Sequence, residues 1–196
     1  MPLLIGKISA SHIHSLRTDR SEVMNSGYTV QQTMKQGSLM AIKTGDKLPS
    51  FTLNDQNGKL FSIDDLIGKK NIVIYFYPKD ETSICTAEAE GFRDASTRFE
   101  GVDATIIGIS SDSVNSHKNF AKNHKLPFIL LSDPDKKVQN LFAVPKDLLG
   151  MLPGRTTYIA NKEGIVIHIF DHAFSADKHV AAALKSLQKE SSDQKK

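Results

Sequence analysis

Cys85 is the only cysteine in this chain of 196 residues, and it ends the stretch PKDETSIC, which begins at Pro78 and contains Thr82. The preceding run NIVIYFY (71–77) is apolar enough to be a strand buried on both faces, and the residues after Cys85 repeat apolar positions at helical spacing. Thr82 or Ser83 can serve as the N-cap of that helix. The thiol then lies in the first helical turn, where unpaired backbone N–H groups and the positive end of the helix dipole favour a reactive thiolate.

A lone cysteine has two interpretations: a small buried hydrophobe or a reactive thiol. It excludes an intramolecular disulfide, a C-x-x-C redox pair and a zinc site built on cysteines. Cys85 is at the end of an apolar stripe formed by Phe92, Ala95 and Phe99, so we expect it to face the core. It also follows the carboxyl end of a strand, where open α/β sheets bind their ligands, which favours the reactive thiol.

The elements that must position this cysteine alternate along the chain from residue 44. A hairpin with an Asn57-Gly58 turn and a short helix capped by Ser62 come first. Strands and helices then alternate, and an antiparallel hairpin and a final helix close the fold. After strand 71–77, the expected elements are helix 85–100, strand 104–110, helix 113–124, strand 127–131, helix 135–142, strands 155–160 and 164–170, and helix 176–188. We therefore predict an α/β protein whose mixed central sheet is flanked by helices and preceded by a hairpin.

The ends of the chain differ from its body. Residues 1–43 have no sustained periodicity, so we predict a disordered extension, with the folded domain at 44–189 and a solvated tail at 190–196. The extension weakly resembles an organellar transit peptide, and a tail without targeting function is an equal alternative. We expect a cytoplasmic protein, or one in a plastid or another organelle if residues 1–43 are a transit peptide.

Charge and motifs argue against several classes of function. Residues 44–188 carry 17 basic and 18 acidic residues, so the body has no basic stripe for nucleic acid, and no apolar run is long enough to span a membrane. The pairs His12/His14 and His168/His172 lack the setting of a metal site, and no glycine-rich phosphate loop is present. We expect neither a metal nor a cofactor.

The stretch PKDETSIC resembles the P-x-x-x-[T/S]-x-x-C motif of peroxiredoxins, and the segments FTLNDQNGK, FRD, LPF.LLSD and VPKDLLGMLPGRTTYI are similar to the Q-type branch, also called bacterioferritin-comigratory proteins. The resemblance covers residues 45–188 and implies a thioredoxin-like three-layer sandwich. It implies that the Cys85 thiolate reduces hydrogen peroxide and organic hydroperoxides, with Arg155 as the catalytic arginine. Thr82 would hydrogen-bond the thiolate and the substrate, and Pro78 would shield the sulfur.

The sequence departs from this branch at two places. Ser83 and Ile84 replace a common Pro-Gly pair, and Glu90 stands where many members carry a resolving cysteine. We therefore expect a one-cysteine peroxidase whose sulfenic acid is reduced by thioredoxin, glutaredoxin or glutathione, and whose Cys85 helix stays wound. We also expect a monomer. The alternative is a redox sensor or chaperone-like protein on the same fold, without catalysis.

Overall fold

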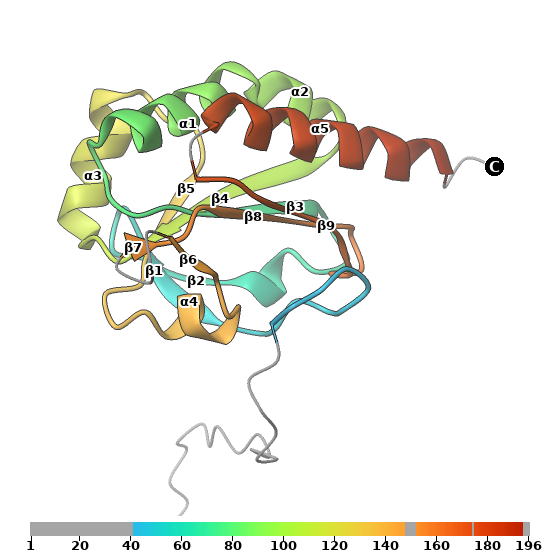
Figure 1. Cartoon of the computed structure of the whole chain (residues 1–196), viewed down its shortest axis with the longest axis horizontal. Coiled ribbons are helices and arrows are strands. Elements are labelled where there is room, and N and C mark those ends of the chain that lie inside the picture. The colour runs from blue at the N-terminus through green and yellow to red at the C-terminus, as the bar shows by residue number, and fades with distance from the viewer. Residues whose placement is uncertain (1–40, 148–151, 174, 194–196) are drawn as a thin grey trace, which may run out of the picture. The chain divides into compact units, whose positions relative to one another are not determined.

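A mixed sheet of seven strands, in the order β2-β1-β5-β4-β3-β8-β9, forms the centre of the structure (Figure 1). The computed structural model describes residues 41–147, 152–173 and 175–193. The strands are β1 (Thr52–Asp55), β2 (Leu60–Ser62), β3 (Asn71–Phe76), β4 (Ala104–Ser110), β5 (Ile129–Ser132), β8 (Thr156–Ala160) and β9 (Val166–Asp171). The helices are η1 (Ile63–Asp65), α1 (Ser83–Asp94), α2 (Ser96–Gly101), α3 (Val114–Asn123), α4 (Lys137–Leu141) and α5 (Ala176–Asp193). Two short strands, β6 (Lys146–Asp147) and β7 (Leu152–Pro153), pair separately.

The middle of the sheet is formed by β3, β4 and β5, which run parallel to one another. β1 pairs antiparallel with β5, and β8 pairs antiparallel with β3 and with β9. All six residues of β3 are buried, as expected for a strand covered on both faces. The carboxyl end of β3 is therefore at the centre of the sheet, between β4 and β8.

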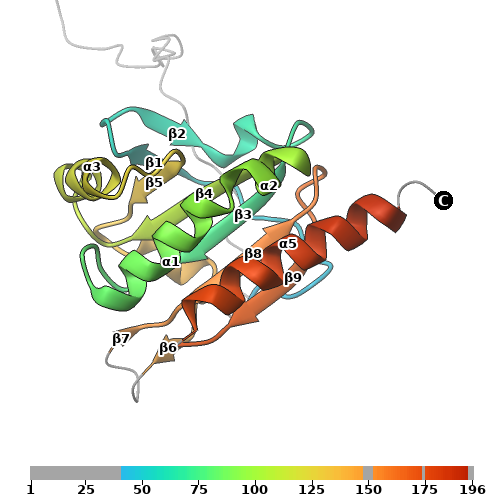
Figure 2. The same cartoon turned by 90° about the horizontal axis from the view of Figure 1, so that it is seen from above.

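Two apolar clusters cover the two faces of the sheet. Alternate side chains of β3 enter different clusters: Val73 and Tyr75 pack with α1, α2, α3 and α5, whereas Ile72 and Ile74 pack on the side of η1 and α4. α1 and α5 lie side by side on the first face, and α4 lies on the other (Figures 1 and 2). This arrangement confirms the predicted three-layer α/β sandwich, including the β1–β2 hairpin before β3.

Three features differ from the sequence prediction. The helix expected at 85–100 is interrupted at Ala95, whose backbone (φ −93°, ψ 1°) is not helical. The last helix runs five residues beyond the predicted end at Gln188, since no glycine or proline stops it there, and it crosses the predicted domain boundary at 189. The β6–β7 pair was not predicted.

Most of the predicted N-terminal extension, residues 1–40, lies outside the described residues, and so does the end of the tail at 194–196. His12 and His14 belong to that extension. Within the described part of the chain, no helix combines the length and apolar character needed to cross a membrane.

Candidate active site

Cys85 lies in the first turn of α1, behind the carboxyl end of β3. Thr82 occupies the N-cap position in extended conformation, and Cys85 follows three residues later. Its side chain is only 1% exposed and packs in the apolar cluster that contains Tyr75, Tyr77 and Phe92. The thiol thus combines a helix N-terminus with an apolar, water-poor environment, and a cation beside it would be weakly screened there.

Arg155 supplies that cation from the neighbouring strand β8. It immediately precedes β8, and the antiparallel register that pairs Phe76 with Thr156 brings the start of β8 to the end of β3. The Arg155 side chain is buried, and its Nη2 donates a hydrogen bond to Cys85 Sγ at 3.3 Å. Its Nε donates to the carbonyl of Ala173 at 3.2 Å. The planar guanidinium is thus held in a fixed position against the sulfur.

Glu88 contacts the third nitrogen of the Arg155 guanidinium. It lies one helical turn after Cys85, is fully buried, and forms an ion pair with Arg155 Nη1. Burial raises the pKa of Glu88 to about 7, although the charge and hydrogen bond of Arg155 act in the opposite direction. Glu88 and the Cys85 sulfur therefore both contact the same buried cation.

His179 lies behind Glu88 as a neutral imidazole. Its Nε2 donates to the carbonyl of His172 at 2.9 Å, so its Nδ1 accepts the hydroxyl proton of Thr157 at 2.8 Å. Burial is the main cause that lowers the pKa of His179 to about 4. Nδ1 lies 3.5 Å from Glu88 Oε1, an oxygen without a hydrogen-bond partner among the described residues. Among the described residues, the Glu88 carboxyl group therefore accepts its hydrogen bond from Arg155 alone.

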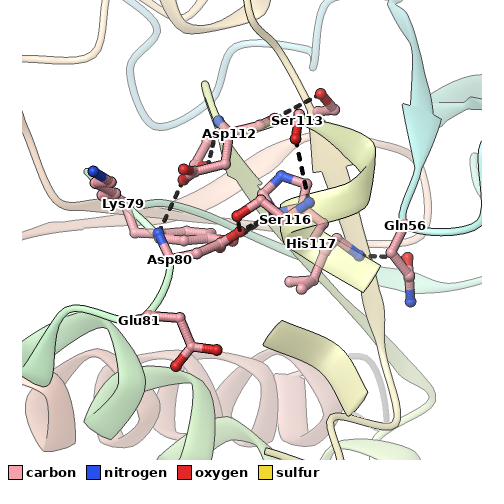
Figure 3. A network of polar contacts seen from close by, with 12 residues as sticks. Gln56, Lys79, Asp80, Glu81, Asp112, Ser113, Ser116 and His117 are labelled. Carbon is pink, nitrogen blue, oxygen red and sulfur yellow. Dashed lines mark hydrogen bonds and ion pairs between the residues drawn. The ribbon is translucent and has the colours of Figure 1, made fainter. Parts of the chain in front are cut away.

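Asp80 anchors the loop that leads from β3 into α1. The Tyr77 hydroxyl and the Ser116 hydroxyl each donate to its carboxylate at 2.7 Å, and His117 Nδ1 lies 2.9 Å from it (Figure 3). Its backbone N–H donates to Asp112 Oδ2 at 2.9 Å. Burial alone raises the pKa of Asp80, but the hydrogen bonds from His117, Ser116 and Tyr77 outweigh it and keep this pKa below its ordinary value. The loop is therefore fixed to the start of α3.

Thr82 and Pro78 lie in this same loop. The Thr82 hydroxyl donates to the carbonyl of Lys79 at 3.0 Å, and it makes no side-chain capping bond to α1. The Thr82 side chain is exposed, and Pro78 is half-buried. The Thr82 hydroxyl thus donates to a backbone carbonyl while the Cys85 sulfur accepts from Arg155, and the predicted contact of Thr82 with the thiol and the substrate stays a prediction.

Comparison with known proteins identifies the family to which this arrangement belongs. Residues 44–169 match the AhpC/TSA family. The chain belongs to this peroxiredoxin family. It is 42% identical over 181 residues to "Peroxiredoxin Q, chloroplastic" of Sedum lineare, a match that covers 92% of this chain and 95% of the relative. It is 41% identical over 185 residues to the protein of the same name from Populus jackii, a match that covers 94% of this chain and 85% of the relative.

Solved structures agree with this assignment. The crystal structure of peroxidoxin BcpB from Mycobacterium tuberculosis matches with a TM-score of 0.70 and 36% identity, covering 76% of this chain and 97% of that one. A Xanthomonas campestris peroxiredoxin Q structure matches with a TM-score of 0.65 and 32% identity, covering 71% of this chain and 90% of that one. The chain is therefore a peroxiredoxin of the Q-type branch, with the thioredoxin-like fold that the sequence predicted.

Sequence reasoning identified two groups that the structure brings together, Cys85 and Arg155, which are 70 residues apart. It missed Glu88, His179 and Asp80. Glu88 had a usable signal, because it lies three residues after Cys85 on the same helical face, where a carboxylate requires a buried cation. His179 had no comparable signal, since its position depends on how α5 packs against β8 and β9.

Proposed function

We propose that this peroxiredoxin is a thiol peroxidase in which Cys85 reacts with the peroxide. The observation that carries the proposal is the hydrogen bond from the buried Arg155 fork to Cys85 Sγ at 3.3 Å. A guanidinium in this position stabilises the thiolate, and it is also close to the place where negative charge develops on a peroxide that approaches the sulfur. A protein that only senses oxidation does not require such stabilisation of a leaving group, so the arrangement favours catalysis.

The first half of the reaction is the reduction of the peroxide. The Cys85 thiolate attacks one oxygen, an S–O bond forms, the O–O bond breaks, and the other oxygen leaves with the bonding pair. The leaving hydroxide or alkoxide takes up a proton and departs as water or alcohol, and Cys85 remains as a sulfenic acid. Arg155 can donate to the reacting oxygens while Glu88 and the Ala173 carbonyl keep its plane fixed.

Thr82 and Pro78 are proposed to shape the place where the peroxide binds. Because the Thr82 hydroxyl already donates to the Lys79 carbonyl, its oxygen keeps lone pairs that can accept a hydrogen bond from a peroxide O–H. Pro78 has no backbone donor and a fixed φ, so it stiffens the entry to the loop and limits access of water to the sulfur.

The second half of the reaction is proposed to use an external thiol. With one cysteine in the chain, the sulfenic acid is attacked by a thiol to give a mixed disulfide and water, and a second thiol releases reduced Cys85. Thioredoxin, glutaredoxin and glutathione are the candidate donors. The Cys85 side chain is 1% exposed, so the smallest of these, glutathione, requires the least opening of the site.

The proposed substrates are hydrogen peroxide and organic hydroperoxides. The bacterioferritin comigratory protein of Xanthomonas campestris, whose solved structure is 31% identical in sequence to this chain, has alkyl peroxide reduction activity. This supports the inclusion of alkyl hydroperoxides for the present chain, which we propose acts as a monomer.

Rapid mixing of the reduced protein with hydrogen peroxide, and separately with cumene hydroperoxide, tests the proposal. We expect Cys85 to be oxidised orders of magnitude faster than a free thiol, with sulfenic acid on Cys85 detected by mass spectrometry after chemical trapping. Cys85→Ser is the control. Each donor is then added with excess peroxide, and several turnovers with one of them identify the reductant. Oxidation no faster than that of free cysteine would refute the proposal.

The relatives from Sedum lineare and Populus jackii are named chloroplastic. We propose that residues 1–43 of this chain are a transit peptide that directs it to a plastid. A fluorescent protein fused to residues 1–43 should then enter plastids, whereas a fusion to residues 44–196 should not. Uptake of neither fusion would favour the cytoplasm.

A further inference from the structure

Two histidines, one in α3 and one directly after it, contact two consecutive acidic residues of the loop before Cys85. His117 and His124 are seven residues apart, and they contact Asp80 and Glu81 respectively. Figure 3 shows Asp80 facing α3 and Glu81 pointing away from the Asp80 cluster. The Asp80–His117 pair is fully buried, whereas the Glu81–His124 pair is partly exposed. The two contacts therefore differ in how readily solvent protons reach them.

His124 lies between two carboxylates that come from opposite sides of Cys85 in the sequence. Its Nε2 lies 2.9 Å from Glu81 Oε2, and its Nδ1 lies 3.2 Å from Glu90 Oε1. Glu81 precedes Cys85 by four residues, and Glu90 follows it by five. An ionised carboxylate only accepts hydrogen bonds, so both ring nitrogens must carry a proton for both contacts to form. The geometry requires an imidazolium.

We call the contacts of His124 with Glu81 and Glu90 the His124 junction. Other groups around His124 add to this junction. Arg93 of α1 donates from Nη1 to the His124 carbonyl at 2.9 Å and lies 3.5 Å from Glu90. Asn123 donates to the second oxygen of Glu81 at 2.9 Å. The ring of Phe120 contacts the imidazole edge-on, with centroids 4.9 Å apart. Other charged residues of this region are Lys122 and Lys125, which flank His124 in the sequence, Asp94, which pairs with Arg93 Nε, and Asp80, whose charge acts on Glu81.

The backbone conformation of Glu81 connects this junction to the start of α1. Glu81 has φ of 59°, in the left-handed region that a residue with a Cβ adopts only when its surroundings impose it. It directly precedes the N-cap Thr82, so its conformation sets where α1 begins. Contacts that hold the Glu81 side chain therefore also hold the first turn of α1, which contains Cys85.

We propose that His124 is a positioning residue for Cys85: as an imidazolium it ties Glu81 and Glu90 together and holds the loop and α1 in the reactive arrangement, and its deprotonation loosens them. The proposal rests on the proposed peroxidase function and adds a control of the same site by pH. No proton or electron of the peroxide passes through His124, which acts only through the position of α1.

The direction of the pH effect follows from the surroundings of His124. The hydrogen bond with Glu81 is the largest cause that raises the pKa of His124, burial opposes it, and Glu90 raises it further. The two contacts are thus fully present below about pH 6.5, the ordinary value for histidine, and are lost as the pH rises through the higher pKa of the folded protein. The thiolate fraction of Cys85 changes in the opposite sense, so the two effects must be separated experimentally.

The test compares wild-type protein with His124→Gln, which removes the charge, and with His168→Gln, a matched control in β9 at the opposite edge of the sheet. The oxidation rate constant with hydrogen peroxide is divided by the thiolate fraction measured by ultraviolet absorbance. At about pH 6 we expect His124→Gln to lower this thiolate-specific constant about two- to fivefold, the range of exposed ion pairs. As the pH rises through the raised pKa of His124, the two proteins should converge, because the wild-type side chain then loses its charge.

Hydrogen exchange of residues 79–90 provides the second readout. At about pH 6 the amides of this segment should exchange faster in His124→Gln than in wild type and His168→Gln, and Glu90→Gln should give a smaller increase. Equal exchange and equal thiolate-specific constants at this pH would overturn the proposal. A difference between His124→Gln and wild type that has the same size at every pH would also overturn the proposal, since it would indicate that His124 acts by packing and not by its charge. If wild-type Cys85 proves unreactive, the proposed function fails, and the exchange comparison alone then decides whether the junction exists.

Discussion

Replacement of Glu88 by glutamine should change how stability depends on pH. Glu88 is fully buried, and its pKa lies at about 7 instead of the ordinary 4.5. The folded state therefore keeps a proton on Glu88 between these two values, where the unfolded state has released it. Folded wild-type protein then loses stability as the pH rises through this window. The loss is complete above about pH 7, where Glu88 is ionised in both states.

The magnitude follows from the size of the shift. A shift from 4.5 to about 7 corresponds to about 3 kcal/mol at about 1.4 kcal/mol per unit. Glutamine cannot ionise, so the free energy of unfolding of Glu88→Gln should lack this pH-dependent change. The amide oxygen can still accept from Arg155, but the amide N–H groups face only His179 Nδ1, which lies 3.5 Å from Oε1 in the wild type. Near pH 4.5 the free energy of unfolding of the variant should therefore be no higher than that of wild type. Between this pH and about pH 8, wild type should lose about 3 kcal/mol of unfolding free energy that the variant keeps.

Urea unfolding between about pH 4.5 and about pH 8.5, followed by circular dichroism because the chain has no tryptophan, measures this difference. Glu163→Gln, at an exposed position in the turn between β8 and β9, is the matched control and should follow the wild-type curve. Parallel curves for wild type and Glu88→Gln would refute the reasoning, because they would show that burial does not hold a proton on Glu88.

Three further predictions concern the arginine, the loop anchor and the helix. Arg155→Lys keeps the charge but loses the planar fork, and we expect the peroxide rate constant to fall about 10²–10³-fold in rapid-mixing assays, with an unchanged constant arguing against a role for the fork. Asp80→Asn breaks the buried contact with His117 and should lower the free energy of unfolding by about 3–5 kcal/mol in urea titrations, whereas the exposed Asp135→Asn should have little effect. Hydrogen exchange of residues 86–95 should be the same before and after peroxide treatment, since no second cysteine draws α1 apart, and strong deprotection on oxidation would contradict this.

Much of the fold was accessible from local patterns. The run NIVIYF is buried on both faces as its composition indicates, and the Asn57-Gly58 turn and the Ser62 cap both appear where expected. These features depend on neighbours in sequence, so the sequence alone contains the relevant information.

The parts that escaped prediction depend on contacts between distant segments. His179 reaches Glu88 only because α5 packs beside α1, and His117 reaches Asp80 only because α3 packs beside the loop. The resemblance to a known family located Arg155, whose position in the chain carries no local signal of its own. The Thr82 hydroxyl illustrates the remaining difficulty, because a hydroxyl rotates toward whichever acceptor is present, here the Lys79 carbonyl.

The pairing of β3 with β8 also determines when the chain acquires its chemistry during synthesis. The cysteine motif is complete at residue 85, but the cation that faces the sulfur is added 70 residues later and reaches it only after β8 has paired with β3. A nascent chain that ends before residue 155 lacks the guanidinium that donates to the Cys85 sulfur, and β3 is then an edge strand of the sheet. On the proposed role of Arg155, reactivity toward peroxide is therefore acquired only once β8 has been synthesised and has paired with β3.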